Sequence, residues 1–286
     1  MARYGAVEIG GTKTDAAVGS SPDTFSTPHR IATTTPEETL GEVAKFLVSH
    51  DVAAIGVASF GPLDLDASSP GYGSILATPK AGWNGASVLE AIKSAAGVPV
   101  GIDTDVNGAA LGEGRWGAAR GMSDYVYVTV GTGIGAGVVV NGRPISGERH
   151  PETGHLVVSR HERDDYPGNC PYHGDCLEGM ASGPALEARF GRSDTWAGNE
   201  AVLDLVTHYV GQGLRDLVYT VAPERIIVGG GVSRLPFFHE RIRIVLSGLL
   251  AGYPADPDLE LLVSKPGLGQ LSGLAGGLVL AERASS

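Results

Sequence analysis

Two stretches of the chain share one pattern, in which an apolar strand, a glycine turn and a second apolar strand follow one another. The first stretch covers residues 4–18, YGAVEIGGTKTDAAV, and the second covers residues 124–140, DYVYVTVGTGIGAGVVV. Aligned without a gap, the two stretches bring Gly10 opposite Gly131. A unit that recurs in this way indicates an internal duplication, so we expect two related α/β halves.

Amphipathic helices and short buried strands fill most of the remaining chain. A spacing near 3.6 between apolar residues predicts helices, and Pro36 with the acids after it marks the start of the first one. The predicted helices cover 36–49, 86–96, 108–119, 184–221 and 271–284, and the predicted strands cover 53–63, 99–107 and 223–234. Residues 148–183 are polar and rich in His, Gly and Pro, so we expect an inserted loop module there.

The composition limits the partners and the compartment. A net charge of -11 over 286 residues repels nucleic acid and anionic membranes, so we expect neither as a partner. No apolar run is long enough to span a bilayer, and the first residues, MARYGAVEIGG, do not have the pattern of a signal peptide. Because the chain has only two cysteines and no such leader, we expect a cytoplasmic protein without a disulfide framework.

The two glycine turns do not match the common nucleotide-binding motifs, and we interpret them as phosphate-binding turns of another kind. A dinucleotide fingerprint fails because position 136 is Ala and a strand follows, and a P-loop fails because Lys13 follows GGT directly. Successive N–H groups of a glycine turn form a concave anion site, and two such turns can hold one polyphosphate from both sides. The candidate phosphate-binding residues are Gly10, Gly11, Thr12, Lys13, Gly131, Thr132 and Gly133. We expect Gly229, Gly230 and Gly231 to lie close to a nucleoside.

Three acids are candidates for chemistry beside a bound polyphosphate. Asp105 lies where a predicted strand ends, a place that presents reactive groups in α/β folds, so it is a candidate general base. Asp103 is a second candidate, and N-capping of the next helix by Asp105 or Asn107 explains the same pattern equally well. Glu8 precedes the first glycine turn and is a candidate for holding Mg²⁺ through water.

The two cysteines flank a histidine in the segment CPYHGDC, residues 170–176. Cys170, His173 and Cys176 are ligand types that suit tetrahedral Zn²⁺, and a fourth protein ligand would close the site as a structural one. The candidates for this fourth ligand are His150, His155 and His161. The acidic charge, and the absence of a basic helix after the motif, disfavour a zinc finger that binds nucleic acid.

Eight segments of the chain stand in the order that is typical of one known family. They are VEIGGTKT, ASFGPLD, TPKAGWNG, DTDVNGAALGE, VGTGIGAGVVVNG, HPETGHL, CPYHGDCLEGMASGPA and IIVGGGV. With them the chain resembles the ROK family of sugar kinases, and most closely its bacterial zinc-containing fructokinase branch. The resemblance implies an α/β fold of two actin-like, ribonuclease-H-like ATPase domains that flank a cleft. We expect a small domain over 1–115, with helix 272–286 packed back on it, and a large domain over 116–271 that carries the zinc loop 148–183.

The resemblance also implies a reaction, the ATP-dependent phosphorylation of D-fructose to fructose 6-phosphate. Asp105 matches the catalytic base that takes the proton of the sugar hydroxyl, in preference to Asp103. The two glycine turns match the phosphate loops, and residues 229–231 match the adenosine segment. The substrate-binding positions implied by the matching motifs are Gly61, Thr104, Glu152, His155 and Glu178. His155 also matches the fourth zinc ligand.

Three departures from the family pattern bear on these roles. Glu8 stands where many members have Asp, which changes the reach toward Mg²⁺. Thr104 stands where Asn often precedes the catalytic Asp, which alters one expected sugar contact. His173 lies in a zinc loop that commonly carries three cysteines, and its presence is typical of the fructokinase branch, so it favours fructose.

Two alternative functions share this scaffold. One is a kinase for mannose, glucose or an N-acetylhexosamine, because a few hydroxyl-binding groups decide which sugar fits. The other is a non-catalytic, sugar-sensing regulator. Repressors of the family carry a DNA-binding segment before the core, and we expect none here because the first phosphate strand begins close to Met1. The resemblance further implies ATP, Mg²⁺ and structural Zn²⁺ as cofactors, sugar and ATP as partners, and a homodimer.

Overall fold

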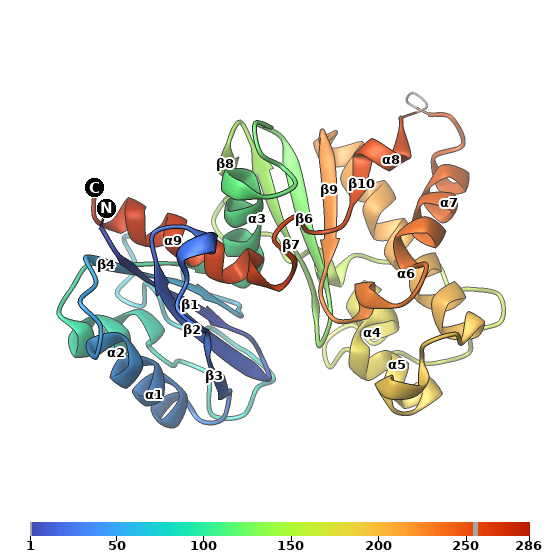
Figure 1. Cartoon of the computed structure of the whole chain (residues 1–286). Helices are drawn as coiled ribbons and strands as arrows, with labels where there is room; N and C mark the ends of the chain where they lie inside the picture. The colour runs from blue at the N-terminus through green and yellow to red at the C-terminus, as the bar shows by residue number, and fades with distance from the viewer. Residues whose placement is uncertain (1, 254–256) are drawn as a thin grey trace. The chain divides into compact units, whose positions relative to one another are not determined.

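The computed structural model describes residues 2–253 and 257–286, which Figure 1 colours along the chain. Its internal contacts group the chain into two compact units. Unit 1 consists of Met1–Gly121, Pro144–Pro151 and Gly267–Ser286, and unit 2 consists of Met122–Arg143 and Glu152–Pro266. Two five-stranded sheets organise the fold.

The sheet of unit 1 has the strand order β3-β2-β1-β4-β5. Its strands are β1 (Tyr4–Ile9), β2 (Lys13–Gly19), β3 (His29–Ala32), β4 (Ala54–Ser59) and β5 (Val100–Thr104). β1 and β2 form an antiparallel hairpin, whereas β4 and β5 run parallel to β1. The last residues of β1, β4 and β5 are in register with one another, so the segments that follow these three strands leave the sheet at one edge.

Helices cover both faces of this sheet (Figure 1). α1 (Pro36–Val48) begins at its cap Thr35 and packs with α2 (Val88–Ala96) over the face that carries Val7. α9 (Ser272–Ala284) packs over the opposite face, where Ala6 contacts it. Successive residues of a strand point to opposite faces, which is why Ala6 and Val7 belong to different apolar clusters.

The two helices α3 (Asp105–Trp116) and α9 approach each other through small residues. A Cβ atom at Gly276 would lie 1.8 Å from the carbonyl oxygen of Gly108, so only glycine permits this contact. The helix predicted over 271–284 is confirmed as α9, and its glycines allow this close packing.

The second sheet has the strand order β10-β9-β6-β7-β8. Its strands are β6 (Tyr125–Val130), β7 (Ile134–Val140), β8 (Arg143–Pro144), β9 (Arg225–Gly229) and β10 (Val263–Ser264). β6 and β7 form an antiparallel hairpin, β9 runs parallel to β6, and β10 runs parallel to β9. Followed from β8 to β10, this is the topology of the first sheet, as the alignment of the two glycine turns predicts.

One large apolar cluster forms the core of unit 2. It joins β6, β7 and β9 to helices α4, α6 and α7. The helices of this unit are α4 (Leu177–Ala181), α5 (Gly183–Phe190), α6 (Glu200–Val221), α7 (Phe238–Leu250) and α8 (Leu259–Leu262). α6 is capped by Asn199, whose side chain accepts hydrogen bonds from two N–H groups of the first turn. Within the described residues, no helix has the length and apolar character needed to cross a membrane.

The structure confirms the predicted fold class and most predicted elements, and it corrects several details. The helix predicted over 184–221 is two helices, α5 and α6, which residues 191–199 separate. The helix predicted over 108–119 begins at Asp105, and its cap is Thr104 rather than Asp105 or Asn107. The module over 148–183 is not wholly loop, because its last part forms α4. The segments that form β3, α7 and α8 were not predicted as elements from the sequence.

Candidate functional site

The first glycine turn joins β1 to β2 at the edge of the unit 1 sheet where β5 also ends. The N–H group of Gly10 donates to the carbonyl oxygen of Lys13 at 2.9 Å and closes the turn. A Cβ atom added at Gly11 would meet no atom within 4 Å. Sterics within the protein therefore do not explain glycine at this position, which fits close approach of a ligand to the backbone.

The side chain of Lys13 is held beside this turn by an ion pair. Its ammonium lies 3.0 Å from Asp15, and the Arg30 guanidinium donates to both oxygens of the same carboxylate at 2.7 and 3.0 Å. Burial acts to raise the pKa of Asp15, but hydrogen bonds from Arg30 and Lys13 outweigh it and hold that pKa below its usual range. Asp15 is thus an anion that orients Lys13. Neither Asp15 nor Arg30 was predicted from the sequence as a site residue.

Glu8 and Asp105 are close enough to interact at this edge of unit 1. Burial raises the pKa of Glu8 to about 7, the Lys13 ammonium partly opposes this rise, and the Asp105 carboxylate adds to it. The side chain of Glu8 lies against the start of α9, because a Cβ atom at Gly273 would stand 2.3 Å from its carboxyl carbon. Two carboxylates beside this glycine turn are groups that suit a divalent cation.

Asp103 and Asp105 have different surroundings. Asp103 accepts hydrogen bonds from the Asn107 side chain at 2.8 Å and from the Thr104 N–H at 2.7 Å, and burial raises its pKa. Asp103 therefore stabilises the start of α3 through these two hydrogen bonds. Asp105 is the first residue of that helix, and its carboxylate accepts from the N–H group of Val106 at 2.9 Å.

Two further predicted substrate positions lie at the same edge of unit 1. Gly61 is the second residue after β4. Thr104 is the last residue of β5, and its buried hydroxyl accepts a hydrogen bond from the Asn107 N–H at 3.2 Å. Since a hydroxyl that accepts can still donate, this capping bond is compatible with a polar contact to a ligand.

In unit 2, the second glycine turn, the triple glycine and Glu178 come together. The Glu178 carboxylate accepts from the N–H group of Ile134, the first residue of β7, at 2.8 Å. The carbonyl oxygen of Gly131 accepts from the Gly183 N–H at 2.7 Å. Gly230 has a φ of +88°, and a Cβ atom there would lie 2.4 Å from the carbonyl oxygen of Val130, so the triple glycine packs directly on the end of β6.

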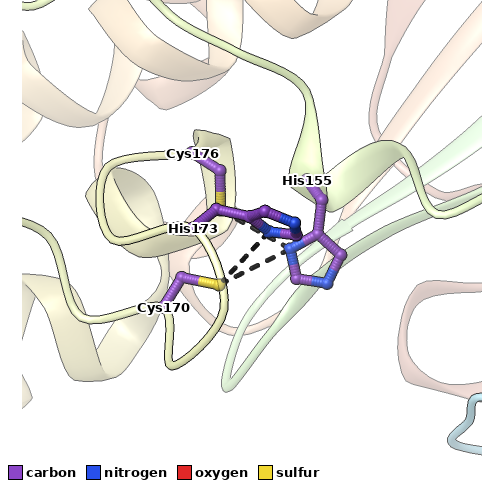
Figure 2. Close-up of side chains that lie close together, drawn as sticks. All are labelled: His155, Cys170, His173 and Cys176. Atoms are coloured by element: carbon purple, nitrogen blue, oxygen red, sulfur yellow. Dashed lines mark hydrogen bonds between the residues drawn. The ribbon is translucent and has the colours of Figure 1, made fainter.

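Four side chains of unit 2 converge on one point, as Figure 2 shows. They are His155, Cys170, His173 and Cys176, and their potential ligand atoms all lie within 4.8 Å of one another. The Sγ–Nδ1 distances are 3.7 Å from Cys170 to each histidine and 3.5 Å from Cys176 to His155. Tetrahedral zinc with ordinary bond lengths places nitrogen and sulfur ligands about 3.6 Å apart, so the residues fit this ion.

The other two candidate histidines are occupied elsewhere. His150 belongs to unit 1, where its Nε2 accepts a hydrogen bond from the N–H group of Leu63 at 3.0 Å. The ring of His161 packs against His208, and its Nε2 lies 3.8 Å from a carboxylate oxygen of Asp204. Geometry therefore favours His155 as the fourth ligand of the cluster.

The backbone around the four ligands is fixed by short-range bonds. The N–H group of Leu177 donates to the carbonyl oxygen of Leu156 at 2.9 Å, which ties the turn after Glu152 to the start of α4. Burial raises the pKa of the Cys176 thiol to about 11. Binding of a metal ion would therefore release a proton from this thiol.

A buried ion pair anchors the rest of the loop module to the unit 2 core. Asp164 accepts from the Arg189 guanidinium at 2.6 Å and from the Tyr209 hydroxyl at 2.7 Å, and both members of the ion pair are nearly inaccessible to solvent. Burial raises the pKa of Tyr209 to about 12, so its hydroxyl remains a donor. None of these residues was singled out from the sequence, because the partners come from segments 20 or more residues apart.

Lys80 and Thr33 also contact the first glycine turn, and neither was predicted from the sequence as a site residue. Lys80 donates to the carbonyl oxygen of Gly11 at 2.7 Å, and the Thr33 hydroxyl donates to that of Gly10 at 2.8 Å. The segment TPKAGWNG was recognised as a family motif, and this was the one signal that pointed to Lys80.

Known proteins match the chain over almost its whole length. A model of the ROK family matches residues 4–284. The fructokinase of Zymomonas mobilis is 42% identical over 293 residues, which cover 99% of this chain and 97% of the relative. The fructokinase of Pediococcus pentosaceus is 40% identical over 285 residues, which cover 98% of each chain. The solved ROK family glucokinase from Streptomyces griseus, in complex with glucose and AMPPNP, has a TM-score of 0.80 at 27% identity and covers 98% of this chain and 99% of its own.

Proposed function

The chain belongs to the ROK family, and we propose that it is an ATP-dependent fructokinase, which transfers the γ-phosphoryl group of ATP to D-fructose and forms fructose 6-phosphate. The observation that carries this proposal is the near-full-length match to relatives named fructokinase. The two glycine turns on sheets of one topology agree with a phosphoryl-transfer enzyme, because each turn offers backbone N–H groups to an anion.

We assign the proton transfer to Asp105. Its position as the first residue after β5 presents the carboxylate at the sheet edge that also carries the first glycine turn. A carboxylate there can accept the proton of the sugar hydroxyl as this oxygen forms its bond to the γ-phosphorus, while the bond to the β,γ-bridging oxygen of ATP breaks. Asp103 is held by Asn107 and Thr104, so it supports the helix instead.

We assign phosphate binding to Gly10, Gly11, Thr12 and Lys13 in unit 1 and to Gly131, Thr132 and Gly133 in unit 2. Contact with the adenosine is assigned to the triple glycine, whose packing on the end of β6 is compatible with close backbone approach. Glu8 would hold Mg²⁺ through water, and the ion would neutralise charge on the phosphates.

Sugar recognition is assigned to Gly61 and Thr104 in unit 1 and to Glu152, His155 and Glu178 in unit 2. His155, Cys170, His173 and Cys176 would hold one structural Zn²⁺, which would join the turn after Glu152 to the start of α4. These four metal ligands would then hold the carboxylates that we propose to bind the sugar. Glu178, for example, lies on α4 two residues after Cys176.

We further propose that the enzyme is a homodimer and works in the cytoplasm with ATP, Mg²⁺ and a sugar as its partners. The family resemblance supports the dimer, and the cysteine-poor composition supports the compartment. Sedimentation of the purified protein tests the dimer directly.

A substrate panel tests the proposed function. The purified protein is assayed for ADP formation with fructose, mannose, glucose, N-acetylglucosamine and N-acetylmannosamine at equal concentrations. We expect kcat/KM for fructose to exceed that for every other sugar by about tenfold or more, a difference that a few hydroxyl contacts can supply. A clear preference for another hexose would replace fructose in the proposal, and no ADP formation with any sugar would contradict a sugar kinase.

A further inference from the structure

All three carbonyl groups of the first glycine turn are held by side chains or backbone outside the turn. The carbonyl oxygen of Gly10 accepts from the Thr33 hydroxyl at 2.8 Å, and that of Thr12 accepts from the Thr33 N–H at 3.0 Å. The carbonyl oxygen of Gly11, between them, accepts from the Lys80 ammonium at 2.7 Å. The turn is therefore fixed on its carbonyl side by two residues, 21 or more positions away in the chain.

Lys80 is itself well fixed. Its ammonium also donates to the carbonyl oxygen of Thr33 at 3.0 Å, so the same cation joins the glycine turn to the segment around Thr33. The neighbouring Trp83 is fully buried, its indole N–H donates to the carbonyl oxygen of Thr34 at 2.7 Å, and its ring packs edge-on against Phe60. This arrangement holds the loop that carries Lys80 against the start of α1.

We propose that Lys80 is a positioning residue for phosphate binding. By holding the carbonyl side of the first glycine turn, Lys80 preorganises the N–H groups on the other side. A trans peptide is planar, so its C=O and N–H groups point in opposite directions. Fixing the carbonyl groups of Gly10, Gly11 and Thr12 therefore fixes the N–H groups of Gly11, Thr12 and Lys13 on the other side of the turn. Lys80 fixes the carbonyl group of Gly11, which belongs to the central peptide of the three. The inference rests on the proposed role of this turn in binding ATP.

Two physical effects make a lysine suitable for this position. An ammonium donates charge-assisted hydrogen bonds, which are roughly twice as strong as neutral ones, so the turn does not have to order itself when phosphate binds. The positive charge also lies behind N–H groups whose positive ends face the anion, so it adds to their attraction. Removing the ammonium should weaken phosphate binding and leave the affinities for the sugar and for adenosine unchanged.

Calorimetric titration of Lys80→Met with AMPPNP, without sugar, tests this inference. We expect its Kd for AMPPNP to rise by about tenfold to hundredfold over wild type, which is the loss of one or two charge-assisted bonds. Binding of adenosine and of fructose should change by less than about twofold, because the affected contact is specific to phosphate. Lys93→Met, at an exposed position on α2 of the same unit, is the matched control and should bind AMPPNP as wild type does.

Two further variants separate positioning from general structural support. Lys80→Arg should recover most of the AMPPNP affinity, since a guanidinium can donate to the same two carbonyl groups. Thr33→Val removes the bond to Gly10, and its effect should be non-additive with Lys80→Met because both act on one turn. If Lys80→Met does not fold, Thr33→Val alone tests whether the carbonyl side of the turn supports phosphate binding. We then expect its Kd for AMPPNP to be about threefold or more above that of wild type.

AMPPNP binding that stays within about twofold of wild type in folded Lys80→Met would overturn this inference alone. An equal loss of adenosine and AMPPNP affinity would overturn it too, because the role would then be general support of the fold. Wild-type protein that binds no adenine nucleotide would instead contradict the proposed function.

Discussion

The glycine turn of unit 1 and the glycine turn of unit 2 occupy the same place in two sheets of one topology, yet they have different neighbours. In both, the N–H group of the first glycine closes the turn with a 2.9 Å hydrogen bond. The position after the first turn is Lys13, which pairs with Asp15, whereas the aligned position after the second is Ile134, whose N–H group donates to Glu178. At this aligned position the first turn therefore has a lysine side chain, whereas the second has a backbone N–H group that a carboxylate binds.

The two units also differ at the ends of their outermost parallel strands, where the signs of the charges are reversed. β5 is followed by Asp105, and its counterpart β10 is followed by Lys265. The duplicated backbone supplies similar turns to both units, while side chains give them different chemistry. We infer that unit 1 supplies the reacting carboxylate and a charge-supported phosphate turn, and that unit 2 supplies the metal cluster and the carboxylate on its turn.

The largest expected effect comes from removing the carboxylate of Asp105. Asp105→Asn should lower kcat for fructose phosphorylation by about 100- to 10,000-fold, the range typical of a lost general base, while fructose still binds. Steady-state kinetics with calorimetric binding of fructose measure both quantities. Asp103→Asn is the control at the neighbouring acid, and we expect it to lower stability more than kcat. Near-wild-type turnover in Asp105→Asn would remove this residue from the mechanism.

Much of this contrast could be predicted from the sequence, because the information is local. The hairpins around Gly10 and Gly131 follow from apolar strands that flank glycine, and α1 follows from Pro36 and its apolar spacing. The motif around Cys170 and Cys176 identified three of the four converging side chains directly, and the resemblance added the fourth.

The parts that sequence patterns missed depend on contacts between distant residues. Lys80 meets Gly11 across 69 positions, so no local pattern records the bond. Glu113 is fully buried and accepts hydrogen bonds from the N–H groups of Gly267 and Leu268, more than 150 positions away. The start of α3 was misplaced because a capping Thr104 resembles an ordinary strand residue until its hydroxyl is seen to accept from the helix.

Loss of the metal ligands should have the next largest effect, confined to unit 2. We expect about one zinc per wild-type chain, and none in His155→Ala or Cys176→Ser. Without the ion the free energy of unfolding should fall by about 2–4 kcal/mol, since a ligand present far above its Kd stabilises the folded state by this amount. Elemental analysis and urea denaturation measure the two quantities. His161→Asn should retain its zinc, and loss of zinc in that variant would contradict the assignment of His155.

The smallest expected effect is the pH dependence caused by Glu8. Its pKa of about 7 lies above the ordinary value of 4.5, so the folded protein holds this proton more tightly than the unfolded chain does. Without divalent ions, stability should therefore fall as pH rises from about 5 to 8, and after allowance for solvent screening the loss is about 1–2 kcal/mol. Glu8→Gln should lack this loss and be the more stable protein at pH 8.

Urea denaturation at pH 5 and pH 8, in chelator, measures this difference between wild type and Glu8→Gln. Glu90→Gln, at an exposed position on α2 of the same unit, is the matched control and should keep the wild-type dependence. An unchanged pH dependence in Glu8→Gln would show that another group is responsible.

The hexose panel on the wild-type enzyme, extended by identification of the product, shows whether this protein is a fructokinase. With Mg²⁺, ATP and fructose, ³¹P NMR should show ADP and fructose 6-phosphate forming in equal amounts, with fructose preferred over the other hexoses. ATP that remains intact in the presence of fructose, or a phosphoryl group found on another sugar in preference, would contradict a fructokinase.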